Sequence, residues 1–192
     1  MRFKPVYIIF LIGLLLIQSC GMSLKDSHMN STDKQVDSLL NQMTLDEKIG
    51  QMNQLMNFVD TIPIDSYFYQ LIKDGKIGSV LNSYSPEMTN EMQRIAVEES
   101  RLGIPLLVGR DVIHGYRTIF PVNIGLAATF NPDLVKETAK IAAMEARSEG
   151  VNWTFAPMMD ISRDPRWGRM AESNGEDPFL TTQMAKAYIQ GF

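Results

Sequence analysis

Residues 105–156 read PLLVGRDVIHGYRTIFPVNIGLAATFNPDLVKETAKIAAMEARSEGVNWTFA, and they contain one complete strand–helix–strand unit. The runs PLLVG (105–109) and NWTFA (152–156) are short and apolar, as buried strands are. Between them, Asn131 and Pro132 supply an N-cap and a proline at the first helical position, and Gly150 ends the helix. This order of elements predicts two parallel strands in one sheet.

The same rhythm extends to both sides of this unit. An apolar run at 77–81 predicts another strand, and Ser85-Pro86 predicts a helix that runs to about residue 100. Asp177-Pro178 predicts the start of the last helix. Strands that alternate with helices indicate an α/β fold with a parallel sheet, and the lack of polar alternation predicts strands buried on both faces.

Two short helices are predicted ahead of these strands. Apolar residues at helical spacing predict one over 34–43. Thr44 and Glu47 have the spacing of a capping box, which opens a second helix. We expect that helix to carry Ile49, Met52 and Met56 on one face.

The first 33 residues are expected to serve export rather than the fold. A basic start precedes an apolar run over 6–17, which is shorter than the ~20 residues of a membrane span and typical of a secretory signal. The stretch IQSC (17–20) resembles a bacterial lipobox, although a plain signal peptide with an incidental cysteine is the alternative. We therefore predict a signal peptide over 1–19, lipidation at Cys20, a polar tether over 20–33 and a folded domain over 34–192. The product would be an exported lipoprotein, periplasmic or on the cell surface, that touches a bacterial membrane only through its lipid.

The composition excludes several classes of protein. The 192 residues carry a net charge of −4, which argues against a nucleic-acid binder that neutralises phosphates. One cysteine excludes an intrachain disulfide and a cysteine-based zinc site, and two histidines exclude a three-histidine zinc site. The sequence also lacks the G-x-S-x-G, P-loop and G-x-G-x-x-G motifs. We therefore expect no cofactor and no metal.

Chemistry in such folds lies in the loops after the strands, which here are 110–123 and 157–177. Asp111 directly follows a predicted strand, and its carboxylate could accept two sugar hydroxyls, or else pair with Arg110 or Arg117 or cap a turn. His114 could carry a proton, but a histidine satisfied by the backbone is the more common case.

The second loop is unusually long, and loops of this length are commonly functional. Its interleaved acidic and basic residues predict mutual ion pairs that stiffen it. Trp167 could stack on a sugar or an arginine, or simply fill a gap.

Several stretches together resemble one enzyme family. RLGIPLLVGRDVIHGYRTIFP, NWTFAPMMDISRDPRWGR, GEDPFL and the lead-in MTLDEKIGQM are similar, in order and spacing, to the N-terminal barrel of glycoside hydrolase family 3, bacterial β-glucosidase type. The resemblance covers about 35–192. It implies the N-terminal portion of a (β/α)8 barrel of the TIM type, incomplete in this chain. It also implies a retaining, exo-acting enzyme that removes terminal non-reducing β-D-glucosyl residues from oligosaccharides.

The resemblance also assigns roles to residues. Asp111 would hold the hydroxyls at carbons 4 and 6 of the terminal sugar, and Arg169 of the PRWGR stretch would be the guanidinium on the same sugar. Arg166, His114 and Arg117 would be supporting residues. Glu176-Asp177 matches the GEDP element, in which the aspartate also suits a helix N-cap.

The remaining parts of the family's site are expected downstream. These are a Lys-His pair, the aspartate nucleophile of a Ser-Asp-Trp-like stretch, and a glutamate as the general acid/base. We therefore assign no catalytic residue in this chain and expect no β-glucosidase activity from it alone. The alternatives are a β-xylosidase or β-N-acetylglucosaminidase of the same family, or a lipid-anchored module that binds sugar without chemistry.

Overall fold

The computed structural model describes residues 30–56, 66–83 and 85–192, and it divides the chain into two units, 1–42 and 43–192. The predicted signal peptide and Cys20 lie outside the described residues. The described part of the first unit is the helix α2, Ser31–Gln42, which buries none of its residues. It begins three residues before the predicted start because the Asn30 side chain accepts the amide of Asp33, at 2.9 Å. Residues 31–33 of the expected tether are therefore helical.

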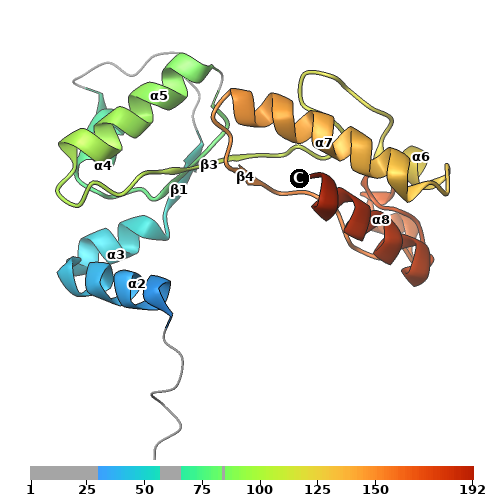
Figure 1. The fold of residues 1–192 in the computed structure, drawn as a ribbon, viewed down its shortest axis with the longest axis horizontal. Helices are drawn as coiled ribbons and strands as arrows, with labels where there is room; N and C mark the ends of the chain where they lie inside the picture. Colours follow the sequence, from blue (N-terminus) through green and yellow to red (C-terminus); the bar gives the residue numbers. More distant parts are fainter. Residues whose placement is uncertain (1–29, 57–65, 84) are drawn as a thin grey trace, which may run out of the picture. The chain divides into compact units, whose positions relative to one another are not determined.

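The second unit contains a sheet of four parallel strands in the order β1-β2-β3-β4 (Figure 1). These strands are β1 Gln54–Met56, β2 Ser79–Leu81, β3 Leu107–Arg110 and β4 Trp153–Thr154. Val80 pairs with Val108 across β2 and β3, and Gly109 pairs with Trp153 across β3 and β4. The predicted parallel sheet is confirmed, with the three expected strands and one more.

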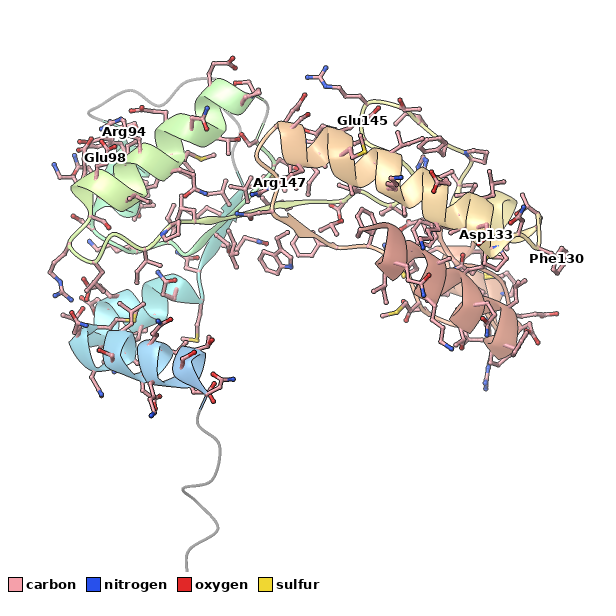
Figure 2. The ribbon with its side chains drawn as sticks, viewed as in Figure 1. Arg94, Glu98, Phe130, Asp133, Glu145 and Arg147 are labelled. Atoms are coloured by element: carbon pink, nitrogen blue, oxygen red, sulfur yellow. The ribbon has the colours of Figure 1, made fainter. Side chains whose placement is uncertain are left out.

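Helices connect the strands, and three of them start at the predicted N-caps. α5 (Pro86–Arg94), α7 (Pro132–Ser148) and α8 (Pro178–Gly191) each begin with a proline, after the capping side chains of Ser85, Asn131 and Asp177. In α7 an acidic Asp133 lies in the first turn and a basic Arg147 in the last, which suits the helix dipole (Figure 2).

Shorter helical elements complete the second unit. The element η2 continues α5 as a π-helix. The bounds of these elements are α3 Leu45–Gln51, α4 Tyr67–Lys73, η2 Ile95–Glu99, α6 Asn123–Ala127, η3 Pro165–Trp167 and η4 Met170–Glu172. None of the described helices combines the length and the apolar character that a membrane crossing needs.

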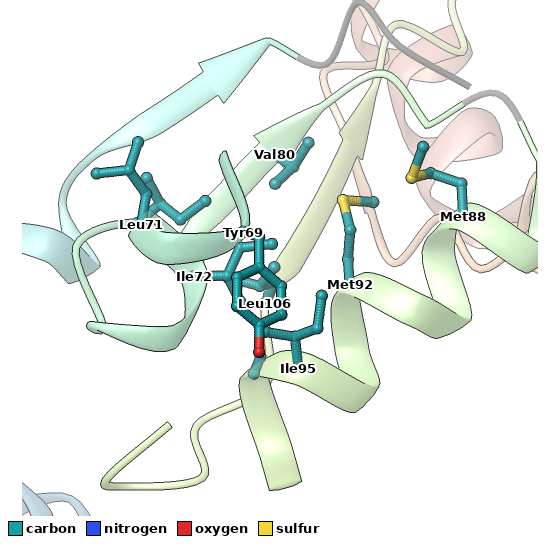
Figure 3. Close-up of a cluster of buried hydrophobic side chains, with 10 residues drawn as sticks. Tyr69, Leu71, Ile72, Val80, Met88, Met92, Ile95 and Leu106 are labelled. Carbon is teal, nitrogen blue, oxygen red and sulfur yellow. The ribbon is translucent and has the colours of Figure 1, made fainter. Parts of the chain in front are cut away.

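The sheet packs its hydrophobic core against α4, α5 and η2 (Figure 3). Val80 of β2, Met92 of α5 and Ile95 of η2 are each fully buried there. A second cluster joins α6, α7 and α8 through Leu126, Val135 and Met184.

The two faces of the sheet differ in burial. Val80 and Val108 are fully buried, whereas Leu107 is 50% exposed and Trp153 38% exposed. Successive side chains of a strand point to opposite faces. The expectation that the strands are buried on both faces is therefore wrong for the described residues, because the face with Leu107 and Trp153 remains partly open.

The largest difference from the predicted elements lies between residues 51 and 56. The helix opened by Thr44 ends at Gln51, and Met56 lies in β1 rather than on a helical face. Here the Asn53 carbonyl accepts the amide of Gly78, at 3.1 Å, which draws the chain into the sheet. Gly50 permits this close approach, because a Cβ there would lie 2.0 Å from the Gly75 carbonyl oxygen.

The predicted capping box is present and joins α3 to a distant segment. The Thr44 hydroxyl accepts the Glu47 amide at 3.2 Å, and the Glu47 carboxylate accepts the Thr44 amide at 2.8 Å. Arg101 donates from Nε to the same carboxylate at 2.8 Å. The Arg101 hydrogen bond, followed by that of the Thr44 amide, lowers the pKa of Glu47 from its ordinary 4.5 to about 2.

We predict that Glu47→Gln lowers the thermal midpoint by a few degrees at pH 7, because it removes a charged partner of Arg101. A carboxyl group whose pKa is lowered by folding stabilises the fold at pH values above its pKa in the unfolded chain. The difference in thermal midpoint between the variant and the wild type should therefore shrink as the pH falls from 4.5 toward about 2. Thermal melts at several pH values measure this. Asp74→Asn, which removes only a surface ion pair with Lys76, is the control. A deficit that does not change with pH would contradict the prediction.

Candidate functional site

The candidate site lies in two loops at the carboxyl edge of the sheet. Asp111 follows β3 directly, and the loop over 157–177 follows β4. Because β3 and β4 are parallel neighbours, their carboxyl ends lie side by side. The topology therefore brings the two predicted chemical segments to one place.

Asp111 is exposed, and it accepts no hydrogen bond from any described residue. The alternatives that pair it with a neighbouring arginine are wrong. Arg110 lies over the ring of Tyr116, 5.6 Å from its centroid, and Arg117 pairs with Glu149. The Asp111 carboxylate is thus open to a ligand.

Arg169 lies within the electrostatic reach of Asp111 and is held by Glu172. Its Nε donates to Glu172 Oε1 at 3.2 Å, and its Nη2 donates to Oε2 at 2.5 Å. The hydrogen bond to Glu172 raises the pKa of Arg169, and the charges of Asp160 and Asp111 add to this effect. Three carboxylates, two from this loop and one from the loop after β3, therefore act on one guanidinium that remains half exposed.

His114 is held by the backbone of its own loop. Its Nδ1 lies 3.0 Å from the Phe120 carbonyl oxygen, and the Phe120 amide donates to the His114 carbonyl at 2.8 Å. Because a carbonyl only accepts, Nδ1 carries the proton. The hydrogen bond from Arg169 lowers the pKa of Glu172, and His114 lies close enough to add a smaller electrostatic contribution in the same direction. The backbone-satisfied interpretation of His114 agrees with this geometry.

Two carboxylates at the end of α7, Glu145 in its last turn and Glu149 at its C-cap, fix the loop that carries Asp111. Glu145 Oε2 accepts the amides of Arg117 and Thr118 at 2.9 and 2.8 Å, and its Oε1 accepts the Thr118 hydroxyl at 2.6 Å. Glu149, which is buried, accepts the Tyr116 hydroxyl at 2.6 Å and pairs with Arg117. Arg117 thus serves the loop as a supporting residue.

The loop over 157–177 is closed at its base by buried polar groups. Ser162 donates its amide to the Gly175 carbonyl at 3.1 Å and its hydroxyl to Ser173. Asn174, which is 1% exposed, donates from Nδ2 to the Met158 carbonyl at 3.2 Å. These contacts tie the two ends of the loop together.

Ion pairs stiffen the tip of this loop, as predicted. Asp164 caps η3 through the Arg166 amide at 2.9 Å and also pairs with the Arg166 guanidinium. The second pair is the one between Arg169 and Glu172. Trp167 is 40% exposed at the same tip. At the end of the loop, Asp177 accepts the Leu180 amide at 2.6 Å, so its predicted role as an N-cap is confirmed.

Sequence reasoning missed the residues that support these loops. Glu145 lies in the last turn of α7 and Glu149 caps its end, and their spacing of four residues is the only local signal for them. Asn123 is fully buried at the start of α6 and donates to the Glu172 carbonyl at 2.8 Å. No local pattern marked it.

The arrangement can hold a polyhydroxylated ligand. Asp111 supplies only acceptors and Arg169 only donors, and this complementarity suits neighbouring sugar hydroxyls. Within the part of the chain that the structure describes, no group of three or more His, Cys, Asp or Glu side chains could hold a metal ion.

The comparisons with known proteins point to one family. The family model described as the glycosyl hydrolase family 3 N-terminal domain matches residues 44–192. A periplasmic β-glucosidase of Salmonella typhimurium is 43% identical over 158 residues, which are 82% of this chain and 20% of that protein. A β-xylosidase of Formosa agariphila is 30% identical over 95% of this chain and 22% of its own length.

A solved structure agrees with the sequence relatives. The crystal structure of a β-glucosidase from Listeria innocua has a TM-score of 0.73 and 42% identity, covering 83% of this chain and 23% of that chain. The same protein was also solved in complex with glucose. The chain therefore spans about a fifth of the length of these relatives.

We predict that Glu145→Gln speeds hydrogen exchange at the Arg117 and Thr118 amides by about tenfold at pH 7, because a charged acceptor becomes a neutral one. The hydrogen bonds from Thr118, its hydroxyl first and then its amide, hold the pKa of Glu145 below its usual range. The wild-type protection should therefore persist at mildly acidic pH. Glu137→Gln, on the same helix but paired only with Lys140 at 4.0 Å, serves as the control. Equal exchange in both variants would refute the anchoring role.

Proposed function

Because the chain belongs to glycosyl hydrolase family 3 through its N-terminal domain, we propose that it supplies the sugar-holding part of a retaining, exo-acting β-glucosidase. Its α/β fold is the N-terminal portion of the TIM-type (β/α)8 barrel of its structural relatives, and β1 to β4 are four of the eight strands. The substrate class is β-linked glucosides or oligosaccharides with a terminal non-reducing glucose.

One observation carries this proposal. The loops after the paired strands β3 and β4 bring Arg169 within the electrostatic reach of Asp111. The carboxylate is exposed and accepts no hydrogen bond from a described residue, and its charge acts on the guanidinium. A carboxylate that accepts two hydroxyls and a guanidinium that donates to a third would fix the orientation of a terminal sugar. Charged hydrogen bonds of this kind contribute about 1.5–3 kcal/mol each.

The cleavage itself needs two further groups. A retaining glycosidase places a nucleophilic carboxylate and a carboxylic acid about 5–5.5 Å apart across the scissile bond. We assign neither role to a described residue of this chain. The proposed division of labour is that Asp111 and Arg169 orient the sugar while carboxylates elsewhere in the enzyme act on it.

The β-xylosidase relative keeps a second candidate substrate open. A β-xyloside lacks the hydroxymethyl group at carbon 6 of glucose. If Asp111 binds the hydroxyls at carbons 4 and 6, it loses one of its two partners with a xyloside. A comparison of the two sugars therefore distinguishes the two activities.

We predict that Asp111→Asn weakens the binding of methyl β-D-glucopyranoside to the chain by roughly ten- to a hundredfold, the equivalent of one charged hydrogen bond. Arg169→Lys should weaken it similarly, because the planar pair of donors is lost. NMR titration of backbone amides measures the affinity and locates the contact. Asp133→Asn, which neutralises an exposed carboxylate in the first turn of α7, is the matched control.

Two results would count against the proposed function. One is a wild-type chain whose amides in 110–118 and 163–175 do not respond to the glucoside. The other is an affinity that Asp111→Asn and Asp133→Asn change equally. Tighter binding of methyl β-D-xylopyranoside than of the glucoside would favour the β-xylosidase alternative.

We further propose that residues 1–19 direct export and that Cys20 is lipidated, with residues 20–33 joining the lipid to the domain over 34–192. The periplasmic relative supports export. The stretch IQSC and the position of the single cysteine support the lipid.

We predict that the wild-type chain, expressed in a Gram-negative host, incorporates radiolabelled palmitate and sediments with membranes. Cys20→Ser should abolish both properties, because the thiol that receives the lipid is gone. Label in the Cys20→Ser variant, or its absence from the wild type, would eliminate the lipoprotein assignment. A soluble periplasmic wild-type product would indicate a plain signal peptide.

A further inference from the structure

Asn123 is a buried polar residue that joins three separate segments. It is 0% exposed at the start of α6. Its Nδ2 donates to the Glu172 carbonyl in η4 at 2.8 Å, and its Oδ1 accepts the hydroxyl of Tyr188 in α8 at 2.9 Å. Both ends of the amide are therefore used, on partners 49 and 65 residues away in the sequence.

The chemistry of the partners fixes the orientation of this amide. The Glu172 carbonyl can only accept, so it must face the NH2 group of Asn123. The oxygen of Asn123 then faces Tyr188, whose hydroxyl donates. Tyr188 is 2% exposed, and burial raises the pKa of its hydroxyl to about 12, so the hydroxyl retains its proton. A flipped amide would place two oxygens against each other in a buried site, which is unfavourable.

The same contact determines where Arg169 can lie. Glu172 is held through its backbone carbonyl by Asn123, and its carboxylate holds the Arg169 guanidinium through two hydrogen bonds. Arg169 itself is about half exposed. An exposed arginine has many rotamers, so its position depends on what fixes its partner.

We propose that Asn123 and Tyr188 are positioning residues for Arg169, acting through a buried Tyr188–Asn123–Glu172 relay. Their importance for sugar binding rests on the proposed function of Arg169. The relay passes from Tyr188 in α8 through Asn123 in α6 to Glu172 in η4, and α6 contacts both of the other elements. It makes the placement of a surface guanidinium depend on two buried hydrogen bonds.

The test removes the Tyr188 hydroxyl and compares the effect with that of removing the hydroxyl of another buried tyrosine. Tyr188→Phe deletes the donor to Asn123 and keeps the ring. Tyr69→Phe, the control, deletes another buried phenol, which donates to Glu99 next to the first hydrophobic cluster. Circular dichroism and thermal unfolding establish that both variants are folded.

The main readout is the NMR signal of the Arg169 side-chain Nε–H group, which a merely stabilising residue would not move. We expect Tyr188→Phe to shift this signal toward that of a freely rotating arginine, and to speed exchange of the Glu172 and Ser173 amides by about tenfold. Affinity for methyl β-D-glucopyranoside should fall by a similar factor. Tyr69→Phe should change none of these quantities.

A second variant keeps the proposal falsifiable if Tyr188→Phe does not fold. Asn123→Asp preserves the side-chain volume and the acceptor for Tyr188, but it replaces the donor to Glu172 with an oxygen. It should produce the same changes at Arg169. An unchanged Arg169 signal in a folded Tyr188→Phe or Asn123→Asp variant would overturn the relay.

The relay and the sugar-binding role can fail separately. A shifted Arg169 signal in a chain that binds no glucoside would uphold the relay and overturn the proposed function. If Arg169→Lys abolishes glucoside binding and Tyr188→Phe leaves it intact, the proposed function stands and the relay is overturned.

Discussion

The parallel pairing of β3 with β4 is the constraint on which the candidate site depends. Gly109 lies opposite Trp153 in this pairing, so the two strands end at the same edge of the sheet. Asp111 leaves that edge from one strand, and the loop that carries Arg169 leaves it from the next. An antiparallel or shifted pairing would separate the carboxylate from the guanidinium, whatever their sequence context.

The exposed groups of the site rest on buried supports. Asp111 and Arg169 are open to solvent, as the proposed sugar contacts must be, whereas the supporting residues Glu149 and Asn123 are buried and hydrogen-bonded. α7 fixes one loop, and α6 with α8 fixes the other. Separate supports suit the proposed function, in which each loop contacts its own side of a sugar, because rigid elements place contact groups more accurately than loops do.

Much of the fold was predictable because its signals are local. The capping residues Ser85, Asn131 and Asp177 act on amides within three residues, so the starts of α5, α7 and α8 follow from the sequence. β1 was missed because its three residues have no strand pattern of their own, and it forms only by pairing with β2. The open face of the sheet was also missed, since apolar strands look alike whether one face or both are covered.

The sequence by itself determined the fold class, the family and the two residues proposed to hold the sugar, because motifs and helix caps depend on residues that are close together in the chain. The tertiary structure alone decided which charges meet. It separated Asp111 from Arg110 and Arg117, joined Arg169 to Glu172, and placed Asn123 between Tyr188 and Glu172. The physical reason is distance along the chain. A buried hydrogen bond between residues 65 positions apart leaves no local pattern, and it exists only once the helices have packed.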